Sequence, residues 1–157
     1  MNIFFRRYIS EFVYGAVDGT VTTFAVVAAS AGAGISSAVI LILGVANLIA
    51  DGFSMGSSAY LAASAEHEES ARDTQKRASP KIIGAVTFLA FVAVGSVPVL
   101  PYLIDVVAGS KAPSTTLFYV SSALTAVAFL TIGFIKGKVG NQSPWRKATV
   151  TLLLGAV

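Results

Sequence analysis

The stretch VYGAVDGTVTTFAVV (Val13–Val27) is apolar enough to lie in a lipid bilayer, yet it carries a carboxylate, Asp18, near its start. The apolar run continues to about Ala31, which gives the roughly 20 residues that an α-helix needs to cross a bilayer. A cleavable signal peptide is the alternative, because Arg6 and Arg7 precede the run. Charged residues are unusual in the core of a signal peptide, so Asp18 favours a retained membrane helix.

The composition of the whole chain also indicates a membrane protein. Of its 157 residues, 55% are hydrophobic and 12% are charged, whereas a soluble domain has about 25% charged residues. The chain has no cysteine, which excludes disulfides and thiolate metal ligands. The net charge of +3 comes without a dense basic run, so the sequence does not indicate nucleic-acid binding.

Long apolar stretches separated by short polar joints predict an all-α, polytopic membrane protein with one transmembrane domain over residues 1–157. We expect complete helices at about 12–31, 37–62, 82–104 and 115–135, and the start of a fifth at about 149. The segment that begins at Thr149 is too short to cross the bilayer at about 1.5 Å per residue.

The distribution of Lys and Arg predicts which side of the membrane each loop faces, because cytoplasmic loops carry an excess of positive charge. One side of the predicted helices holds ten of the eleven basic residues: Arg6, Arg7, Arg72, Lys76, Arg77, Lys81, Lys136, Lys138, Arg146 and Lys147. Lys111 falls on the other side. We therefore expect the N-terminus, the 66–81 loop and the 136–147 loop to be cytoplasmic.

Two carboxylates lie inside the predicted spans, Asp18 in the first and Asp51 in the second. A charge at the centre of a membrane helix costs about 2.5 to 3.5 kcal/mol on an insertion scale, and such residues usually face a bundle interior or a water-filled path. A purely structural hydrogen bond to a Ser or Thr hydroxyl group is the alternative. Two costly carboxylates favour a path for cations or protons.

The second predicted helix places Asn47, Asp51 and Met55 at steps of four residues, so the three side chains share one face. Oxygen ligands bind divalent cations, and a thioether adds a preference for softer transition metals. Asp18 and Met55 are expected at similar depths, roughly 10 Å from the cytoplasmic side. We therefore predict an Fe²⁺ or Mn²⁺ site at Asp18 and Met55, with Asp51 and Asn47 deeper. Core packing of Met55 and an interhelical hydrogen bond of Asn47 are the alternatives.

Three glutamates are expected on the cytoplasmic side of this site. Glu11 precedes Asp18 by one heptad, and Glu66 keeps to the face of Met55 if the second helix continues beyond its span. Glu66 and Glu69 form an ExxE pattern. We predict that these carboxylates collect metal from the cytosol; a solvated charged surface explains the ExxE pattern equally well.

Each of the first two spans also carries a GxxxG pattern, Gly15 with Gly19 and Gly52 with Gly56. Small residues let helices approach closely. The patterns predict either general helix packing or a close approach of the first two helices to each other or to a second copy.

Longer segments of the chain resemble one known family. EFVYGAVDGTVTTFAVVAASAGAG (11–34) and LILGVANLIADGFSMGSSAYLAASAEHE (41–68) resemble the first two helices of the vacuolar iron transporter family, with its DG and SMG motifs. GSVPVLPYL (95–103) and FIKGKVGNQSPWRKATVTLLLGA (134–156) resemble later parts of that family. The resemblance covers nearly the whole chain.

The resemblance implies a five-helix homodimer that moves Fe²⁺, and often Mn²⁺, out of the cytosol in return for protons, with the pathway at the dimer interface. It implies metal-ligand roles for Asp18 and Met55. Relatives with a long glutamate-rich insert between helices two and three differ from this chain, in which about fourteen residues separate Glu66 from Pro80. We therefore expect a short form without the cytoplasmic metal-binding insert.

Three functions remain open from the sequence: a proton-coupled metal exporter, a passive divalent-cation channel, and a non-transporting membrane assembly subunit. Moving a dication out of a cytosol held at about 100 mV negative costs roughly 4.6 kcal/mol, so a passive pore would carry metal inward. Export therefore favours an exchanger, in which carboxylates release metal and return protonated.

The sequence contains no HExxH or P-loop motif, and we do not expect an enzyme. Metal is expected as cargo and not as a cofactor. The expected partners are membrane lipid, divalent metal ions, protons and a second copy of the chain, without nucleic acid. The short loop between the second and third spans favours a prokaryotic plasma membrane, or a vacuolar membrane if the source is eukaryotic.

Overall fold

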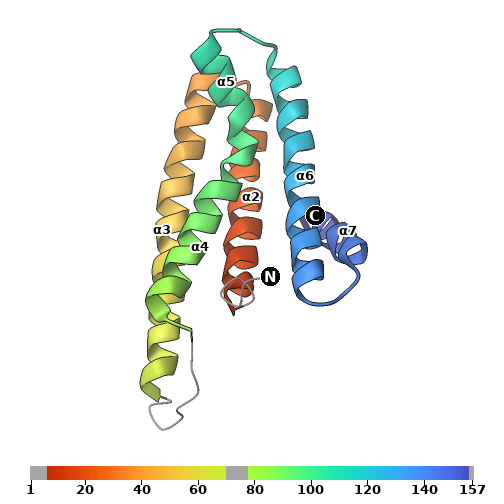
Figure 1. Cartoon of the computed structure of the whole chain (residues 1–157). Coiled ribbons are helices and arrows are strands. Elements are labelled where there is room, and N and C mark those ends of the chain that lie inside the picture. Colours follow the sequence, from red (N-terminus) through yellow and green to blue (C-terminus); the bar gives the residue numbers. More distant parts are fainter. Residues whose placement is uncertain (1–6, 70–77, 156–157) are drawn as a thin grey trace.

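The chain folds into a helical bundle (Figure 1), and the computed structural model describes residues 7–69 and 78–155. Its elements in chain order are α2 (Ile9–Gly32), α3 (Ser37–Glu69), α4 (Pro80–Gly95), the 3₁₀ turn η1 (Val97–Val99), α5 (Leu100–Ala108), α6 (Ser114–Val139) and α7 (Pro144–Gly155). Within the described residues every regular element is helical.

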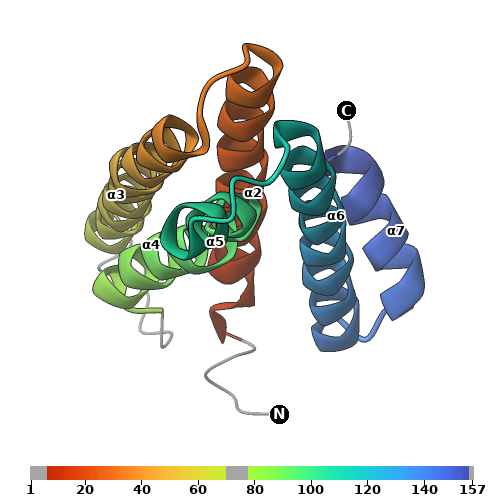
Figure 2. The ribbon, with the colours of Figure 1, turned by 90° about the horizontal axis from the view of Figure 1, so that it is seen from above.

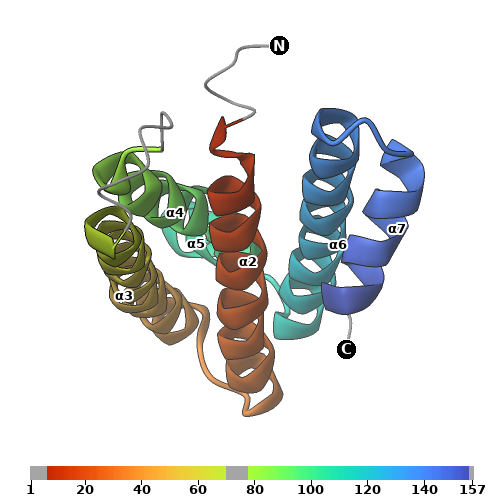
Figure 3. The same ribbon diagram turned by 90° about the horizontal axis from the view of Figure 1, so that it is seen from below.

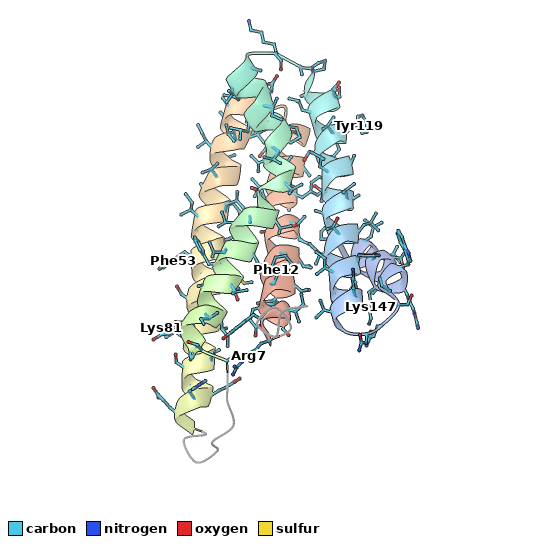
Figure 4. The ribbon with its side chains drawn as sticks, in the orientation of Figure 1. Arg7, Phe12, Phe53, Lys81, Tyr119 and Lys147 are labelled. Carbon is cyan, nitrogen blue, oxygen red and sulfur yellow. The ribbon has the colours of Figure 1, made fainter. Side chains whose placement is uncertain are left out.

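Four stretches are long and apolar enough to cross a membrane: Ile9–Gly32, Ser37–Glu68, Pro80–Ala108 and Ser114–Val139. Large apolar side chains point outward from them, and Figure 4 shows Phe53 on α3 and Tyr119 on α6, which are 68% and 72% exposed. An extensive apolar surface of this kind is unfavourable in water and is accommodated by lipid. The chain is therefore a polytopic helical membrane protein.

The second helix is longer than the 37–62 stretch expected from hydropathy, because α3 continues to Glu69. The added residues, ASAEHEE (63–69), contain neither Gly nor Pro and include good helix formers, so the helix has no local reason to stop at the membrane boundary. Likewise α7 begins at Pro144 and not near Thr149, since proline at the first position of a helix leaves no hydrogen bond unmade.

The third span is not a single rod. Its regular helix α4 ends at Gly95, the 3₁₀ turn η1 follows, and α5 continues to Ala108. Pro98 and Pro101 explain the break, because proline has no backbone N–H and its ring clashes with the preceding turn of an α-helix. The Ser121 hydroxyl group on α6 donates a hydrogen bond of 2.7 Å to the Pro98 carbonyl oxygen. This backbone oxygen at the break therefore has a hydrogen-bond partner inside the protein.

A buried carboxylate organises the loop that follows α5. Asp105 is 7% exposed, and its Oδ1 accepts hydrogen bonds from the Ser110 hydroxyl group at 2.5 Å and from the Ala112 backbone N–H at 2.9 Å. Gly109 ends α5 with φ of 62°, a conformation that favours glycine. Asp105 thus fixes the turn from α5 into α6, and Figure 1 shows α5 at the end of the bundle opposite to the start of α2.

The helix α4 packs between α2 and α3. Figure 2 and Figure 3 show α4 and α5 between α3 and α2, and α7 on the far side of α6. The buried apolar residues form two clusters. One includes Val27, Ile40 and Tyr102, and the other includes Ala16 and Ala90.

Both GxxxG patterns face α4. A Cβ atom on Gly15 would collide with the α4 backbone, and one on Gly19 would lie 2.5 Å from the carbonyl oxygen of Phe91. A Cβ atom on Gly56 would lie 2.9 Å from the carbonyl oxygen of Gly84. The glycines therefore allow the backbones of α2 and α3 to approach α4, and within this chain they do not mediate an approach of α2 to α3.

Candidate metal site

The mid-span part of the site is formed by α2 and α3, which are antiparallel and joined by a short turn at residues 33–36. Asp18 on α2 and Asn47, Asp51 and Met55 on α3 are all partly buried. The α-helical geometry of α3 places the last three on one face, as the spacing of four residues predicts.

The two carboxylates lie close enough to interact. The Asp18 carboxyl group is partly buried in the bundle, and the negative charge of Asp51 acts on it. In the low dielectric of a membrane protein, two neighbouring like charges are unfavourable unless a cation or a proton lies between them. The pair is therefore suited to bind a dication or to exchange it for protons.

Asn47 connects the same two helices one turn further from the start of α2. Its amide Nδ2 donates a hydrogen bond to the Thr23 hydroxyl oxygen at 3.2 Å and lies 3.5 Å from the hydroxyl oxygen of Thr22. The Thr22 hydroxyl group in turn donates to the backbone oxygen of Asp18 at 2.9 Å. The interhelical hydrogen bond that was one alternative for Asn47 is thus present, and it leaves the amide oxygen as the atom that could face a cation.

These contacts define the antiparallel register of α2 and α3. Asp51 is level with Asp18, and Asn47 is level with Thr22 and Thr23. Met55 is one turn from Asp51 and is therefore level with Tyr14, about 5 Å nearer to the start of α2 than Asp18. A methionine side chain is long and flexible enough to reach across one turn, so the thioether and the Asp18 carboxylate can contact the same ion.

One end of the bundle, at which α2 and α4 begin and α3 and α6 end, is named the basic end here. It carries the described residues Arg7, Lys81, Lys136, Lys138, Arg146 and Lys147. Figure 4 shows Arg7, Lys81 and Lys147 in this half of the molecule, whereas Lys111 follows α5 at the opposite end.

A cavity of about 840 Å³ opens at the basic end and is named the vestibule. It is lined by α2, α3, α4 and the end of α6, through Ile9, Ser10, Glu11, Val13, Tyr14, Ala59, Ala62, Ala63, Glu66, Ile83, Thr87, Lys136, Val139 and Gly140. Glu11 and Glu66 thus share one cavity, although 55 positions separate them in the sequence. Asp18 and Met55 are not among the described residues that line the vestibule.

Glu11 lines the vestibule, and one of its carboxylate oxygens is enclosed. Its Oε2 atom is enclosed and, in the described part of the chain, has no hydrogen-bond partner. Glu11 lies in the first turn of α2, where the helix dipole favours a negative charge. Glu11 therefore contributes an acidic side chain to the wall of the vestibule.

The ExxE pattern is only partly described. Glu66, His67 and Glu68 are exposed on the last turns of α3, and the Nδ1 atom of His67 lies 3.1 Å from the Ala63 carbonyl oxygen. Glu69 belongs to α3, but its side chain lies outside the described residues. Over the described ranges 7–69 and 78–155, no three His, Cys, Asp or Glu side chains group closely enough to hold a metal ion. A complete ligand shell therefore needs amide, thioether or water ligands, or a second copy.

Two features of the site were not predicted from the sequence. The hydroxyl groups of Thr22 and Thr23 join the polar network through Asn47, and Lys136 lines the vestibule beside the two glutamates. The sequence signal for the threonines was the TVTT run after Asp18, whereas Lys136 had been counted only as part of the basic loop.

Comparisons with known proteins cover the whole described fold. The sequence model of the VIT family matches residues 9–79 and 69–157, a match that includes every helix from α2 to α7. The chain is similar to a protein from Toxoplasma gondii (strain ATCC 50861 / VEG) named "Vacuolar iron transporter", with 44% identity over 61 residues. That alignment covers 39% of this chain and 20% of the Toxoplasma protein, so the chain spans about a fifth of that relative.

Two plant proteins align over most of both chains. "Vacuolar iron transporter 1" of Eucalyptus grandis is 25% identical over 209 residues, which cover 95% of this chain and 81% of the plant protein. "Vacuolar iron transporter 2" of Oryza sativa subsp. japonica is 24% identical over 208 residues, which cover 95% and 82%. The alignments are longer than the 157-residue chain, so the plant proteins carry residues that this chain lacks.

Proposed function

Because the chain belongs to the VIT family, we propose that it is a metal-ion transporter that exports Fe²⁺, and also Mn²⁺, from the cytosol in exchange for protons. The observation that carries the proposal is the pair of interacting carboxylates, Asp18 and Asp51, on adjacent membrane helices. A dication or protons relieve their repulsion, and the same oxygens cannot hold both at once. Alternate loading of the pair with metal and with protons is the coupling that exchange requires.

The other residues have roles that follow from their positions. Met55 supplies a soft ligand next to Asp18 and favours Fe²⁺ and Mn²⁺ over Mg²⁺ and Ca²⁺. The Asn47 amide oxygen serves as a deeper ligand. The vestibule carboxylates of Glu11 and Glu66, together with Glu69, collect metal before it reaches the mid-span site.

The direction of transport follows from the orientation of the bundle. The basic end is proposed to face the cytosol, because positive residues concentrate on the cytoplasmic side of membrane proteins. The vestibule then opens to the cytosol. Export of a dication against about 100 mV costs roughly 4.6 kcal/mol, so metal release outside is coupled to the inward movement of protons. A prokaryotic plasma membrane and a vacuolar membrane are equally consistent with this topology.

A homodimer is proposed because one chain provides an incomplete site. Asp18, Asp51 and Met55 are only partly buried in the single chain, and no three acidic or histidine ligands of the described residues come together. A two-fold symmetric pair in which these faces meet would double every ligand and would shield the carboxylates from lipid.

The test is metal uptake into proteoliposomes with and without a pH gradient. We expect Fe²⁺ and Mn²⁺ to accumulate from the side facing the basic end, and an opposing proton gradient to raise the initial rate several-fold. The reason is that proton binding on the opposite side resets Asp18 and Asp51. Flux that is unaffected by the pH gradient would identify a passive channel. Absence of any flux, with the dimer retained in Asp18→Asn and Met55→Leu, would identify an assembly subunit.

A second prediction concerns selectivity. Met55→Leu keeps a similar apolar volume but removes the thioether, and we expect the Mg²⁺ concentration that half-inhibits Fe²⁺ uptake to fall roughly tenfold, at the lower end of the losses caused by removing partners of a metal site. Phe53→Leu is the matched control, because Phe53 lies on the same helix and points outward. Equal Mg²⁺ inhibition of the Met55→Leu and Phe53→Leu proteins would remove Met55 from the ligand set.

A further inference from the structure

The vestibule contains a positive charge where a metal-collecting cavity would be expected to hold negative charge only. Lys136, near the end of α6, lines the same cavity as Glu11 on α2 and Glu66 on α3. Three helices thus bring one ammonium group and two carboxylates to one space of about 840 Å³. Glu11 lines this space, and its Oε2 atom is enclosed by the protein, with no hydrogen-bond partner in the described part of the chain.

The position of Lys136 is specific and does not follow from the general basic character of this end of the bundle. Lys138, two residues later on the same helix, is also exposed but is not among the described residues that line the cavity. Residues two apart on an α-helix point about 200° apart, so the two ammonium groups face different surroundings. The lysine stem of four carbons lets the Lys136 charge move within the cavity or out of it.

We propose that Lys136 is a tethered competitor cation that neutralises the vestibule carboxylates when no metal is bound and that a divalent cation must displace. The proposal rests on the transport function above and adds how metal capture is controlled. A dication gains about twice the Coulomb energy of a monovalent cation at the same carboxylates, so it can replace the ammonium group. A free monovalent cation such as K⁺ gains no more than the ammonium group already provides. Lys136 thereby sets the metal concentration at which the vestibule loads and excludes monovalent ions.

The experiment compares Lys136→Gln with Lys138→Gln and Lys136→Arg. Removal of the charge at Lys136 should tighten Mn²⁺ binding to the detergent-solubilised protein by about three- to tenfold, the effect of one charge acting through a partly solvated cavity. In proteoliposomes the KM for Mn²⁺ should fall by the same factor while the maximal rate stays within twofold. We expect Lys138→Gln to match the unsubstituted protein, and Lys136→Arg to restore its KM.

Potassium provides a second readout of the same variants. The K⁺ concentration is raised at constant total ionic strength by replacing the salt of a large organic cation with a K⁺ salt. We expect the added K⁺ to weaken Mn²⁺ binding to the Lys136→Gln protein and to change Mn²⁺ binding to the unsubstituted protein only slightly. The inference is overturned if Lys136→Gln and Lys138→Gln shift the Mn²⁺ Kd equally, or if neither shifts it. Because Mn²⁺ binding is measured without transport, an unsubstituted protein that binds Mn²⁺ but moves none would contradict the proposed function and not the role of Lys136.

Discussion

Asp18→Asn is expected to reduce metal uptake into proteoliposomes by at least about 100-fold, since loss of a direct ligand exceeds the 10- to 100-fold cost of losing an outer partner of a metal site. Asparagine has nearly the same size as aspartate but cannot carry a charge or be reset by a proton. Both the metal-bound and the protonated states of the Asp18 and Asp51 pair are lost in the variant.

The thermal stability of the Asp18→Asn protein distinguishes a ligand role of Asp18 from a structural role. Removing a charge from a membrane helix relieves about 2.5 to 3.5 kcal/mol of insertion cost at most, and it also ends the repulsion with Asp51. The thermal midpoint of the Asp18→Asn protein in detergent should therefore equal or exceed that of the unsubstituted protein. A structural carboxylate would give the opposite result, a lowered midpoint with transport reduced only in proportion to the folded fraction.

Asp105→Asn is the matched control for this experiment. It also exchanges a buried carboxylate for an amide, but near the turn between α5 and α6. The amide oxygen can still accept the hydrogen bonds from Ser110 and Ala112. We expect Asp105→Asn to transport at the unsubstituted rate. Uptake by Asp18→Asn at that same rate would end the proposal that Asp18 is a ligand.

The second large effect is expected at the contact between α2 and α4. Gly19→Ala places a Cβ atom 2.5 Å from the carbonyl oxygen of Phe91 and 3.0 Å from its Cα atom, and backbone atoms of a packed helix cannot move aside cheaply. We expect a loss of about 3 kcal/mol, the upper part of the range for overpacked cores. For a chain of this size that corresponds to a thermal midpoint lower by about 6 to 12 °C.

Gly32→Ala makes the same change on the same helix without the collision, because a Cβ atom on Gly32 meets nothing within 4 Å. Its midpoint should stay unchanged or rise slightly, since alanine is a better helix former than glycine by up to about 1 kcal/mol. The comparison can be read by size-exclusion chromatography of heated samples. Equal midpoints for the two alanine variants would show that α2 and α4 are not in backbone contact.

Hydropathy and spacing were sufficient to predict the elements but not how they pack. The four spans follow from apolar runs of about 20 residues, and the shared face of Asn47, Asp51 and Met55 follows from the period of the α-helix. The packing of α4 between α2 and α3 could not be predicted. The glycines of the two GxxxG patterns indicate that a close partner exists but do not show which helix it is.

The same distinction applies to the site. The pairing of Asp18 with Asp51, and of Asn47 with Thr23, depends on the register of two antiparallel helices, and the sequence of either helix alone does not contain it. Glu11 and Lys136 are far apart in the chain. Both line the vestibule because α6 ends beside the start of α2. A count of charges per loop therefore predicted the orientation but could not assign Lys136 to a cavity.

The glycine contacts on α4 also limit which parts of the protein can move during the proposed transport. Sliding α2 or α3 along α4 by a single residue, about 1.5 Å, would bring side chains against backbone at Gly19 or Gly56. These three helices therefore behave as one rigid body. In the proposed exchanger, alternation of access would then involve other parts of the protein, either tilting of the α6 and α7 hairpin or, in the proposed homodimer, rocking of the two subunits against each other.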